Sequence, residues 1–593
     1  MTTKFRILVA LCSISAALSV VSPASRAAGL EATISVAKDG LWVVPRTMHL
    51  TSLTIAPGAR ISAPKGHSLT LTVNGIGTGI QPGRFTGNVV LTVTKSIVVR
   101  FMKMRPEHFR AAIYVDNGRR VPAKSVMAEV TGGTVTDRAA KDIRITSHQQ
   151  KFNGIIITGR THYTLINPRI TLIGNGSNDF DGFGAGILAK GHAKVLVKGA
   201  RIFSRGVVRP ALVVDGDASL TIDDSSIEVQ NGVLPASYKF SVKPGRMWEV
   251  PYGLGISGNV RATLIVGHGT AYYNNDRITA QAWGALSTDE AGPTWMYVSN
   301  SRIRTIDSGY GAYANGLAHD YFSHDVFNVA TYGLIMSGPG SGTFTDGTVV
   351  NSRRFGVMMH QGTGGGTLTI EKGSIFNTRS TLIEVKGRGT NIMVDDAQLH
   401  PGNGVILQTM DNDDPIMRAM AKKMAGKGGA TAALAEMMPG GSKSLQGFNN
   451  DVSATFRNVT LRGNIYHAMT DLGKLTVRLH HAAIAGAIST STTSPCSGRE
   501  PTRKTYYLIG CVHNTLGPVH GAHGLSVMLG HRSRWTVIRT SYLNTLAIAN
   551  GATISAAPGH SVTLRVDGKE QSIRPGRYTG DLVLQVTSTA GRS

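Results

Sequence analysis

The chain has 593 residues, of which 71 are glycine, and only 16% are charged and 6% aromatic, while 41% are hydrophobic. Neither a disordered chain nor a coiled coil combines so few charges with so many Val, Ile and Leu residues, so both classes are excluded. Lys and Arg number 61 against 36 for Asp and Glu, a formal net charge of +25. This excess predicts a surface that attracts polyanions.

Residues 1–28 have the pattern of a cleaved secretory signal peptide. Lys4 and Arg6 precede an apolar run over residues 7–21, and alanines at 27–28 suit cleavage. The run is shorter than the roughly 18 to 20 apolar residues that span a bilayer, which disfavours the alternative of a membrane anchor. We therefore expect an exported protein, secreted or periplasmic or associated with the cell surface, without a transmembrane segment in the mature chain.

An internal repeat brackets the chain, because residues 42–94 align without a gap on residues 535–587. Both copies alternate apolar residues with Thr or Ser, and Asn74-Gly75 and Asp567-Gly568 mark turns. Each copy is therefore predicted to be a small all-β module. The two copies either form paired surface-binding modules or cap the ends of an elongated body whose strand edges would otherwise lie open.

Between the modules, short strands rich in Val, Ile and Leu recur at a regular spacing. Residues 154–176, 184–206 and 210–232 align position by position, each with three strands separated by turns. A β pattern with this period indicates a solenoid, in which each coil buries its inner face against its neighbours. The pattern resembles the right-handed parallel β-helix proteins of the pectin-lyase-like superfamily over roughly residues 110–490. That resemblance implies a fold but no single activity, since the superfamily includes lyases, hydrolases, tailspikes and adhesins.

The predicted fold is thus all-β, a right-handed parallel β-helix flanked by two homologous small β modules, with one short helical insertion. Asp413, Asp414 and Pro415 form the expected start of that helix. The expected segments are a signal peptide over 1–28, an N-terminal module over 29–109, the β-helix over 110–490 with its helical insertion over 413–440, a connecting segment over 491–530 and a C-terminal module over 531–593.

Cys496 and Cys511 are the cysteines that remain after removal of the signal peptide. In an exported protein they are expected to form a disulfide, with two free thiols as the alternative. The spacing of Cys and His residues matches no zinc motif, so no metal site is predicted. No cofactor is predicted either, and Ca²⁺, although possible in this superfamily, is not indicated because the acidic residues fall at different positions of the coil.

The residue before each coil-starting glycine is repeatedly aromatic, and equivalent positions in a parallel stack lie about 4.8 Å apart. The resulting ladder is either a platform on which sugar rings stack or an internal ladder that supports the solenoid. Polar residues follow at the end of the first strand of each coil and predict one exposed edge. The candidate carbohydrate-binding residues are Trp283, Tyr310, Tyr313, Tyr332, Asn315 and Gln361.

The alternative of an enzyme requires carboxylates, or an Arg or Lys base, that converge in one groove. In the polar row only Asp289 and its neighbour Glu290 supply carboxylates. If the chain is a polysaccharide lyase or a glycoside hydrolase, the candidate catalytic residues are Asp289, Glu290, His360, Arg302 and Arg304.

The leading hypothesis from the sequence is an exported, non-catalytic β-helix protein that binds an anionic polysaccharide or a cell-surface glycan. The positive charge is spread along the chain, which suits a long polymer. A lyase or hydrolase is the first alternative, and an adhesion or assembly protein that uses its twin modules is the second. Nucleic acid is not expected as a partner, because the chain is expected to be exported.

Overall fold

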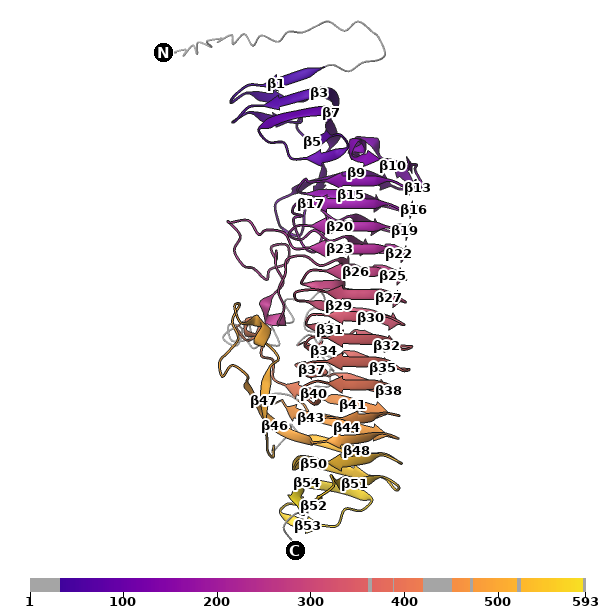
Figure 1. Cartoon of the computed structure of the whole chain (residues 1–593), viewed down its shortest axis with the longest axis vertical. Helices are drawn as coiled ribbons and strands as arrows, with labels where there is room; N and C mark the ends of the chain where they lie inside the picture. The colour runs from indigo at the N-terminus through magenta and orange to yellow at the C-terminus, as the bar shows by residue number, and fades with distance from the viewer. Residues whose placement is uncertain are drawn as a thin grey trace, which may run out of the picture.

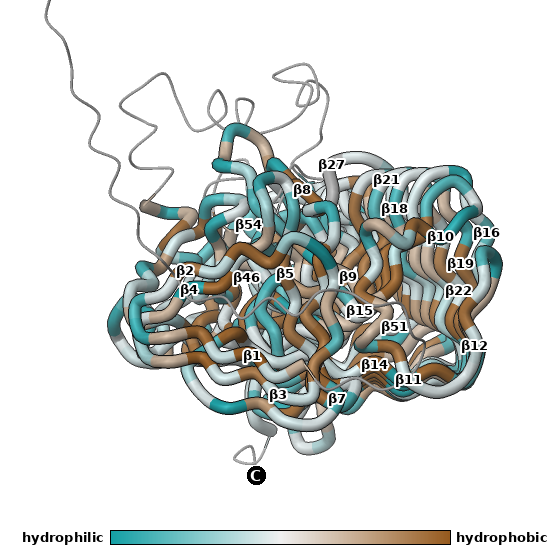
Figure 2. The backbone as a smooth tube through the Cα atoms, turned by 90° about the horizontal axis from the view of Figure 1, so that it is seen from above, coloured by the Kyte–Doolittle hydropathy of each residue, from teal (hydrophilic) through white to brown (hydrophobic). Residues whose placement is uncertain are grey.

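The computed structural model describes residues 32–360, 365–387, 389–419, 451–469, 473–519 and 524–589. Almost all of the regular secondary structure in these residues is β-strand, and the strands stack one above another into an elongated body (Figure 1). Viewed along the long axis, the strands of successive coils superpose (Figure 2). The prediction of an all-β protein is confirmed, and the long parallel stacks are consistent with a β-helix.

Each coil contributes strands to three parallel stacks, which we call the first, second and third stack in chain order. The first stack contains β15 (Phe152–Thr158), β18 (Ile187–Gly191), β21 (Leu212–Gly216), β24 (Thr263–Ile265), the first halves of β27 (Gly284–Ser299) and β29 (Tyr310–Ser323), β31 (Tyr332–Ser337), β34 (Phe355–Met359), β37 (Ile383–Val385), β40 (Val405–Met410), β43 (Asn464–Ala468) and β46 (Ile488–Pro495).

The second stack contains β16 (His162–Ile166), β19 (Lys194–Lys198), β22 (Ser219–Asp223), β25 (Thr270–Asn274), the second halves of β27 and β29, β32 (Ser341–Thr345), β35 (Thr367–Glu371), β38 (Asn391–Asp395), β41 (Val452–Arg457), β44 (Leu475–His480) and β48 (Leu525–Leu529). The third stack contains β14 (Arg144–Ser147), β17 (Arg169–Ile173), β20 (Arg201–Arg205), β23 (Ser226–Gln230), β26 (Arg277–Ala280), β28 (Arg302–Thr305), β30 (Val326–Val329), β33 (Val349–Ser352), β36 (Ile375–Thr378) and β39 (Gln398–Pro401).

The core follows directly from the alternation of side chains along these strands. Ile202, Ile227 and Ile278 stand at the same register position of three successive coils, and all three are buried. Each fully buried aliphatic side chain stabilises the fold by about 1.5–3 kcal/mol relative to an exposed one. One continuous apolar column therefore fills the inside of the coils.

The coil-starting glycines are required by the close approach of neighbouring coils. A Cβ built on Gly333 would lie 2.8 Å from the carbonyl oxygen of Gly356 in the next coil and 2.6 Å from Cγ1 of Val350. Any side chain at this position would push two coils apart, which explains the regular glycine spacing in the sequence.

The two repeat copies have the same strand pairing. In the N-terminal copy β3 (Met48–Ile55) pairs antiparallel with β7 (Gly83–Lys95), which pairs with β5 (His67–Val73). In the C-terminal copy β50 (Ser541–Ile548), β54 (Gly576–Ser588) and β52 (His560–Val566) repeat this order. The copies lie at opposite ends of the described body (Figure 1).

Two covering segments, residues 247–259 and 496–511, lie over the outer side of the first stack. They carry the short 3₁₀ helices η3 (Tyr252–Leu254) and η5 (Tyr506–Leu508). Val250, Leu254 and Ile256 form a second apolar cluster with the outward side chains of the first stack. The first stack therefore has a packed side chain layer on both of its faces.

The predicted helix begins where the sequence indicates. Residues 415–419 are helical, and Oδ1 of Asp414 accepts hydrogen bonds from the backbone N–H groups of Ile416 and Met417 at 2.8 and 3.2 Å. The rest of the expected insertion, residues 420–440, lies outside the described residues. Within the described ranges, no helix has the length and apolar character needed to cross a membrane.

Candidate functional site

The predicted aromatic ladder exists, but it is internal. Trp283, Tyr310 and Tyr332 are 3%, 1% and 0% exposed, and Tyr313 is half-buried against the Tyr310 ring, with the ring centroids 5.3 Å apart. Tyr332 stacks in turn on Phe355 at 5.2 Å. The expectation that Trp283, Tyr310 and Tyr332 offer an open platform for sugar rings is therefore wrong, because the covering segments occupy the space that a sugar would need.

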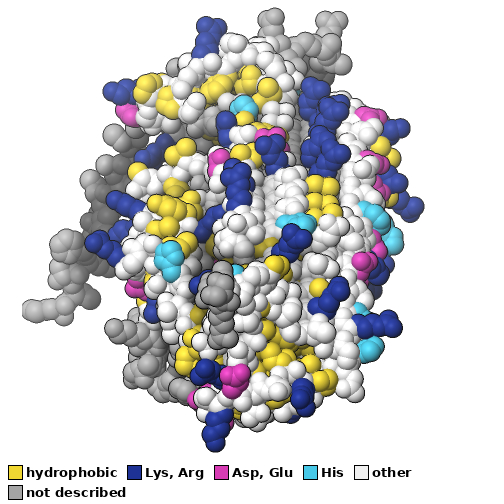
Figure 3. Space-filling view, turned by 60° about the horizontal axis from the view of Figure 1, so that its bottom comes forward, with side chains coloured by type: hydrophobic (Ala, Val, Ile, Leu, Met, Phe, Trp, Pro, Cys, Tyr) yellow, Lys and Arg dark blue, Asp and Glu magenta, His cyan; other side chains and the backbone are white. Residues whose placement is uncertain are grey.

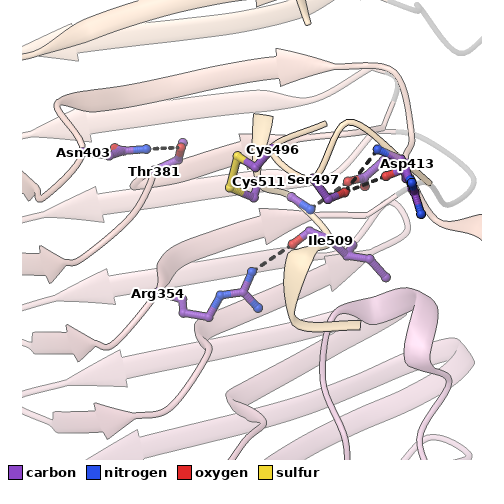
Figure 4. The surroundings of a disulfide bond; sticks show 10 residues. Arg354, Thr381, Asn403, Asp413, Cys496, Ser497, Ile509 and Cys511 are labelled. Carbon is purple, nitrogen blue, oxygen red and sulfur yellow. Dashed lines mark hydrogen bonds between the residues drawn. A yellow bond between two sulfur atoms is a disulfide. The ribbon is translucent and has the colours of Figure 1, made fainter. Parts of the chain in front are cut away.

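A polar network holds the covering segments in place. The guanidinium of Arg354 donates to the backbone carbonyl of Ile509 at 3.0 Å (Figure 4). It also donates to the carbonyl of Gly255 at 3.3 Å and so joins both segments. Cys496 and Cys511, expected to pair, are bonded as a disulfide in the second segment, with their Cα atoms 5.4 Å apart. The segments are thus fastened to the first stack by directional contacts as well as by apolar packing.

Asp289 lies in a buried ionic cluster. Its Oδ2 is 2.6 Å from Nη1 of Arg261, and Nδ2 of Asn315 donates to its Oδ1 at 2.9 Å. Nη2 of Arg261 lies 3.7 Å from the carboxylate of Asp179, and burial raises the pKa of Asp179 to about 8 despite that guanidinium. The side chain of Glu290 lies outside the described part of the structure. The carboxylate and the amide that were expected to face a ligand are held instead by the protein itself.

His360 lies in a second buried cluster. Its Nε2 is 3.2 Å from Oδ2 of Asp414, and both side chains are almost fully enclosed. In the next coil Nζ of Lys386 lies 2.7 Å from Oδ1 of Asp413 and 3.7 Å from Oε2 of Glu384. Burial raises the pKa of Glu384 to about 7, while Lys386 opposes the shift. Gln361, the other predicted residue here, lies outside the described residues.

The candidate catalytic residues do not converge. Asp289 lies on β27, and His360 directly follows β34, which is three steps further along the first stack. At about 4.8 Å per step, roughly 14 Å separates them. Arg302 and Arg304 lie on β28 in the third stack, with both side chains exposed to solvent. Asp289, His360 and the two arginines therefore do not form one acid–base site.

The sequence reasoning missed Lys386 and Glu384 because it followed glycines to find each new coil. Leu382 stands where the preceding coil has Gly356, so this coil carries no glycine signal. The alternation of the following strand, Asn391–Asp395, against Thr367–Glu371 would have revealed it.

An arginine row runs along the outer face of the third stack. These side chains occupy one register position of successive strands and are all exposed. Among the described residues no carboxylate lies within ion-pair distance of any of them. The row consists of Arg144, Arg169, Arg201, Arg277 and Arg302, with Ser226 between the third and the fourth.

A pocket of about 490 Å³ continues the same face toward the C-terminal end. Arg304, Arg353 and Arg379 line it, together with His400 and a column of asparagines at one register position. Nδ2 of Asn377 donates to Oδ1 of Asn351 at 2.8 Å within that column. Arginine fork donors and aligned amides are groups that bind carboxylates and sugar hydroxyls. Figure 3 shows Lys and Arg side chains spread over the face in view, some of them in a contiguous column.

The exposed aromatic ladder lies on the second stack. Tyr272, Tyr297 and Tyr321 are 40%, 36% and 38% exposed and stack nearly parallel, with ring centroids 5.1 and 5.3 Å apart. Trp295 and His319 stack beside them at 4.3 Å. The period-two alternation of these strands, with Tyr273 buried beside Tyr272, is the signal that could have identified the exposed rings.

Within the described ranges, no group of three or more His, Cys, Asp or Glu side chains is arranged to hold a metal ion. A scan against models of known protein families finds no match, and a search of curated proteins finds no relative of significant similarity.

Proposed function

We propose that this chain is an exported, non-catalytic protein that binds an anionic polysaccharide along the outer face of its third stack. The observation that carries the proposal is the row of five exposed arginines without carboxylate partners. Like charges at directly neighbouring strand positions destabilise a sheet, so this arrangement costs stability until an anion neutralises it.

The chemistry of the row favours a polymer with carboxylate or sulfate groups. Arginine binds such groups with two parallel hydrogen bonds, which a lysine ammonium does not offer. Successive arginines repeat at the strand spacing of about 4.8 Å, so one extended chain can contact several coils at once. The pocket lined by Arg304, Arg353 and Arg379 extends the same binding face.

Two further parts of the proposal come from the sequence. The signal-peptide pattern of residues 1–28 supports export, and the three-strand coil supports the right-handed β-helix of the pectin-lyase-like superfamily. Asp289 and His360 are three strand steps apart on the first stack, and Arg302 lies on the third stack, which is why binding is preferred to a lyase or hydrolase activity.

The test is retention of the protein on immobilised polygalacturonate, alginate and neutral dextran over a salt gradient, with release of unsaturated or reducing products assayed in parallel. A variant with Arg144, Arg169 and Arg201 changed to Gln is expected to elute from the acidic polymers at much lower salt. The matched control changes Arg565, Arg574 and Arg577, three exposed arginines of the C-terminal module, and removes the same net charge.

If both variants lost retention on the acidic polymers equally, net charge alone would explain binding, and the proposal would be overturned. Release of unsaturated or reducing products would show that the protein is a polysaccharide lyase or hydrolase, and the binding proposal would be abandoned. Tighter retention on DNA than on any polysaccharide, sensitive to the same arginines, would replace the polysaccharide by nucleic acid.

A second candidate function is stacking of uncharged sugar rings on the tyrosine ladder of the second stack. The exposed, parallel rings of Tyr272, Tyr297 and Tyr321 favour it, because aromatic faces pack against apolar ring faces. Retention on neutral glycans that is insensitive to salt and lost in Tyr297→Ala would support it. Unchanged retention in that variant would exclude it.

A further inference from the structure

The two repeat copies allow a direct comparison of the two ends of the molecule. Their pairing registers are the same, including the irregularity between Leu50 and Ser52 on β3 and between Leu543 and Thr545 on β50. The correspondence also extends upstream of the modules, into the coil strands that precede them. β1 (Thr33–Val36) pairs parallel with β3 as β48 pairs with β50, and β2 (Leu41–Val43) pairs with β4 (Arg60–Ser62) as β49 (Arg534–Val537) pairs with β51 (Thr553–Ala556).

In the C-terminal copy, another coil covers these two strands. β44 pairs in parallel with β48, and β45 (Ala483–Gly486) pairs in parallel with β49. In the N-terminal copy, no described strand pairs with the corresponding edges of β1 and β2. The N-terminal end is therefore a coil edge whose counterpart elsewhere in the same chain is paired along its length.

Alternate backbone N–H and C=O groups of β1 point toward this open edge. The carbonyls of Ala32 and Val36 accept hydrogen bonds from β3 and its extension, at Thr51 and Ala56. Because backbone direction alternates along a strand, the N–H and C=O groups of Thr33 and Ser35 face away from β3. Their equivalents in the C-terminal copy, Ser526 and Met528, are in register with Thr476 and Arg478 of β44.

The tryptophan of the repeat shows the same difference. Trp535 is 0% exposed, and its indole N–H donates to the carbonyl of Gly486 in the covering coil at 3.0 Å. Trp42, at the same position of the N-terminal copy, is half-buried, and its indole has no acceptor among the described residues. Leu41 and Val43 beside it are 73% and 47% exposed. A partner on this edge would enclose an aromatic ring and supply its missing acceptor.

At the opposite end of the molecule, charged side chains prevent the edge strand from pairing with another chain. There the strand at the edge of the sheet is β53 (Lys569–Gln571). It is three residues long and fully exposed, and it carries Lys569 and Glu570. Charged residues on a short edge strand prevent further pairing. β1 and β2 together contain no charged residue, so the protection at one end is missing at the other.

We infer that the edge formed by β1 and β2 is a self-association surface, at which two copies of this chain meet N-terminal end to N-terminal end. The charged edge at β53 disfavours a head-to-tail contact. A two-fold contact between two uncharged β1 edges is self-complementary and closes at a dimer. It replaces, in the N-terminal copy, the pairing that β44 and β45 provide in the C-terminal copy.

The test is sedimentation velocity of the full chain, and of a form that begins at Gly29, over a wide concentration range. The inference predicts an elongated dimer for at least the shorter form. Ser35→Lys places like charges across the two-fold axis and is expected to weaken association by about tenfold or more. Thr33→Lys is the second variant for the same edge, and Gln571→Lys at the opposite end is the matched control.

Each outcome decides the question. A dimer lost in both β1 variants and kept in Gln571→Lys supports the inference, provided that thermal unfolding shows all variants folded. Monomers of both forms at every concentration overturn it. A dimer insensitive to Ser35→Lys and Thr33→Lys, or one broken by Gln571→Lys, places the interface elsewhere and also overturns it.

Discussion

Nη1 of Arg261 lies 2.6 Å from Oδ2 of Asp289, and their side chains are only 4% and 11% exposed. Arg261 stands two residues before β24, and Asp289 lies on β27. The rings of Phe180 and Trp283 pack on the guanidinium, with their centroids 5.4 and 5.3 Å from it. Asp289 therefore stabilises the first stack and does not face solvent as a reactive group.

Asp289→Ala is expected to destabilise the fold by about 3–5 kcal/mol, because it leaves a buried guanidinium without its closest anion. The measurement is thermal and denaturant-induced unfolding. Arg302→Gln, on the exposed face of the third stack, is the control and should change stability by no more than about 0.5 kcal/mol. A folded Asp289→Ala protein of unchanged stability would contradict the structural role.

Stability is expected to fall as the pH rises from mildly acidic to neutral, because of carboxyls such as Asp276. Burial raises the pKa of Asp276 from 3.8 to about 8, against the hydrogen bond from the Ser225 N–H. Between these values the folded chain holds a proton that the unfolded chain has released, so each pH unit costs up to ~1.4 kcal/mol for this group.

Asp276→Asn keeps the acceptor but does not titrate, so it should flatten the dependence of the melting temperature on pH. Asp396→Asn, at an exposed turn of a different coil, does not act on Asp276 and should leave that dependence as it is in the unaltered chain. A profile that rises between pH 4 and pH 8 and is the same in both variants would show that Asp276 is ionised in the folded protein.

Reduction of the disulfide is expected to loosen the second covering segment before the coils unfold. Cys496 and Cys511 are separated by 15 positions. A disulfide that closes a loop of this length stabilises the folded state by about 3 kcal/mol, because it lowers the entropy of the unfolded chain. Cys496→Ser with Cys511→Ser should accelerate protease cleavage within residues 497–510, which is measured by mass spectrometry of the fragments. Cleavage rates equal to those of the oxidised protein would mean that apolar packing alone holds the segment.

Gly333→Ala is expected to destabilise the coil stack by about 1–3 kcal/mol, since its Cβ would meet the Gly356 carbonyl at 2.8 Å. Gly79→Ala is the matched control, because a Cβ there has nothing within 4 Å. The comparison of their melting temperatures separates the clash from the general effect of losing a glycine. Equal melting temperatures would show that neighbouring coils can move apart.

Local patterns in the sequence were sufficient for the fold class. The repeat copies predicted two matching β modules, since turn residues such as Asn74 and Asp567 adopt the left-handed backbone that each hairpin requires. The start of the helix at Asp414 followed from capping chemistry in the same way. These features depend on neighbours in the chain, so the sequence alone determined them.

The candidate site depended on contacts between distant segments. Trp283, Tyr310 and Tyr332 were predicted as a ladder, but only the tertiary structure decided that residues 247–259 and 496–511 cover them. The same holds for the arginine row, whose members lie on strands of separate coils and become neighbours only through the register of the third stack. A period-two pattern specifies two faces of a strand, and the burial of each face is decided by what else in the chain packs against it.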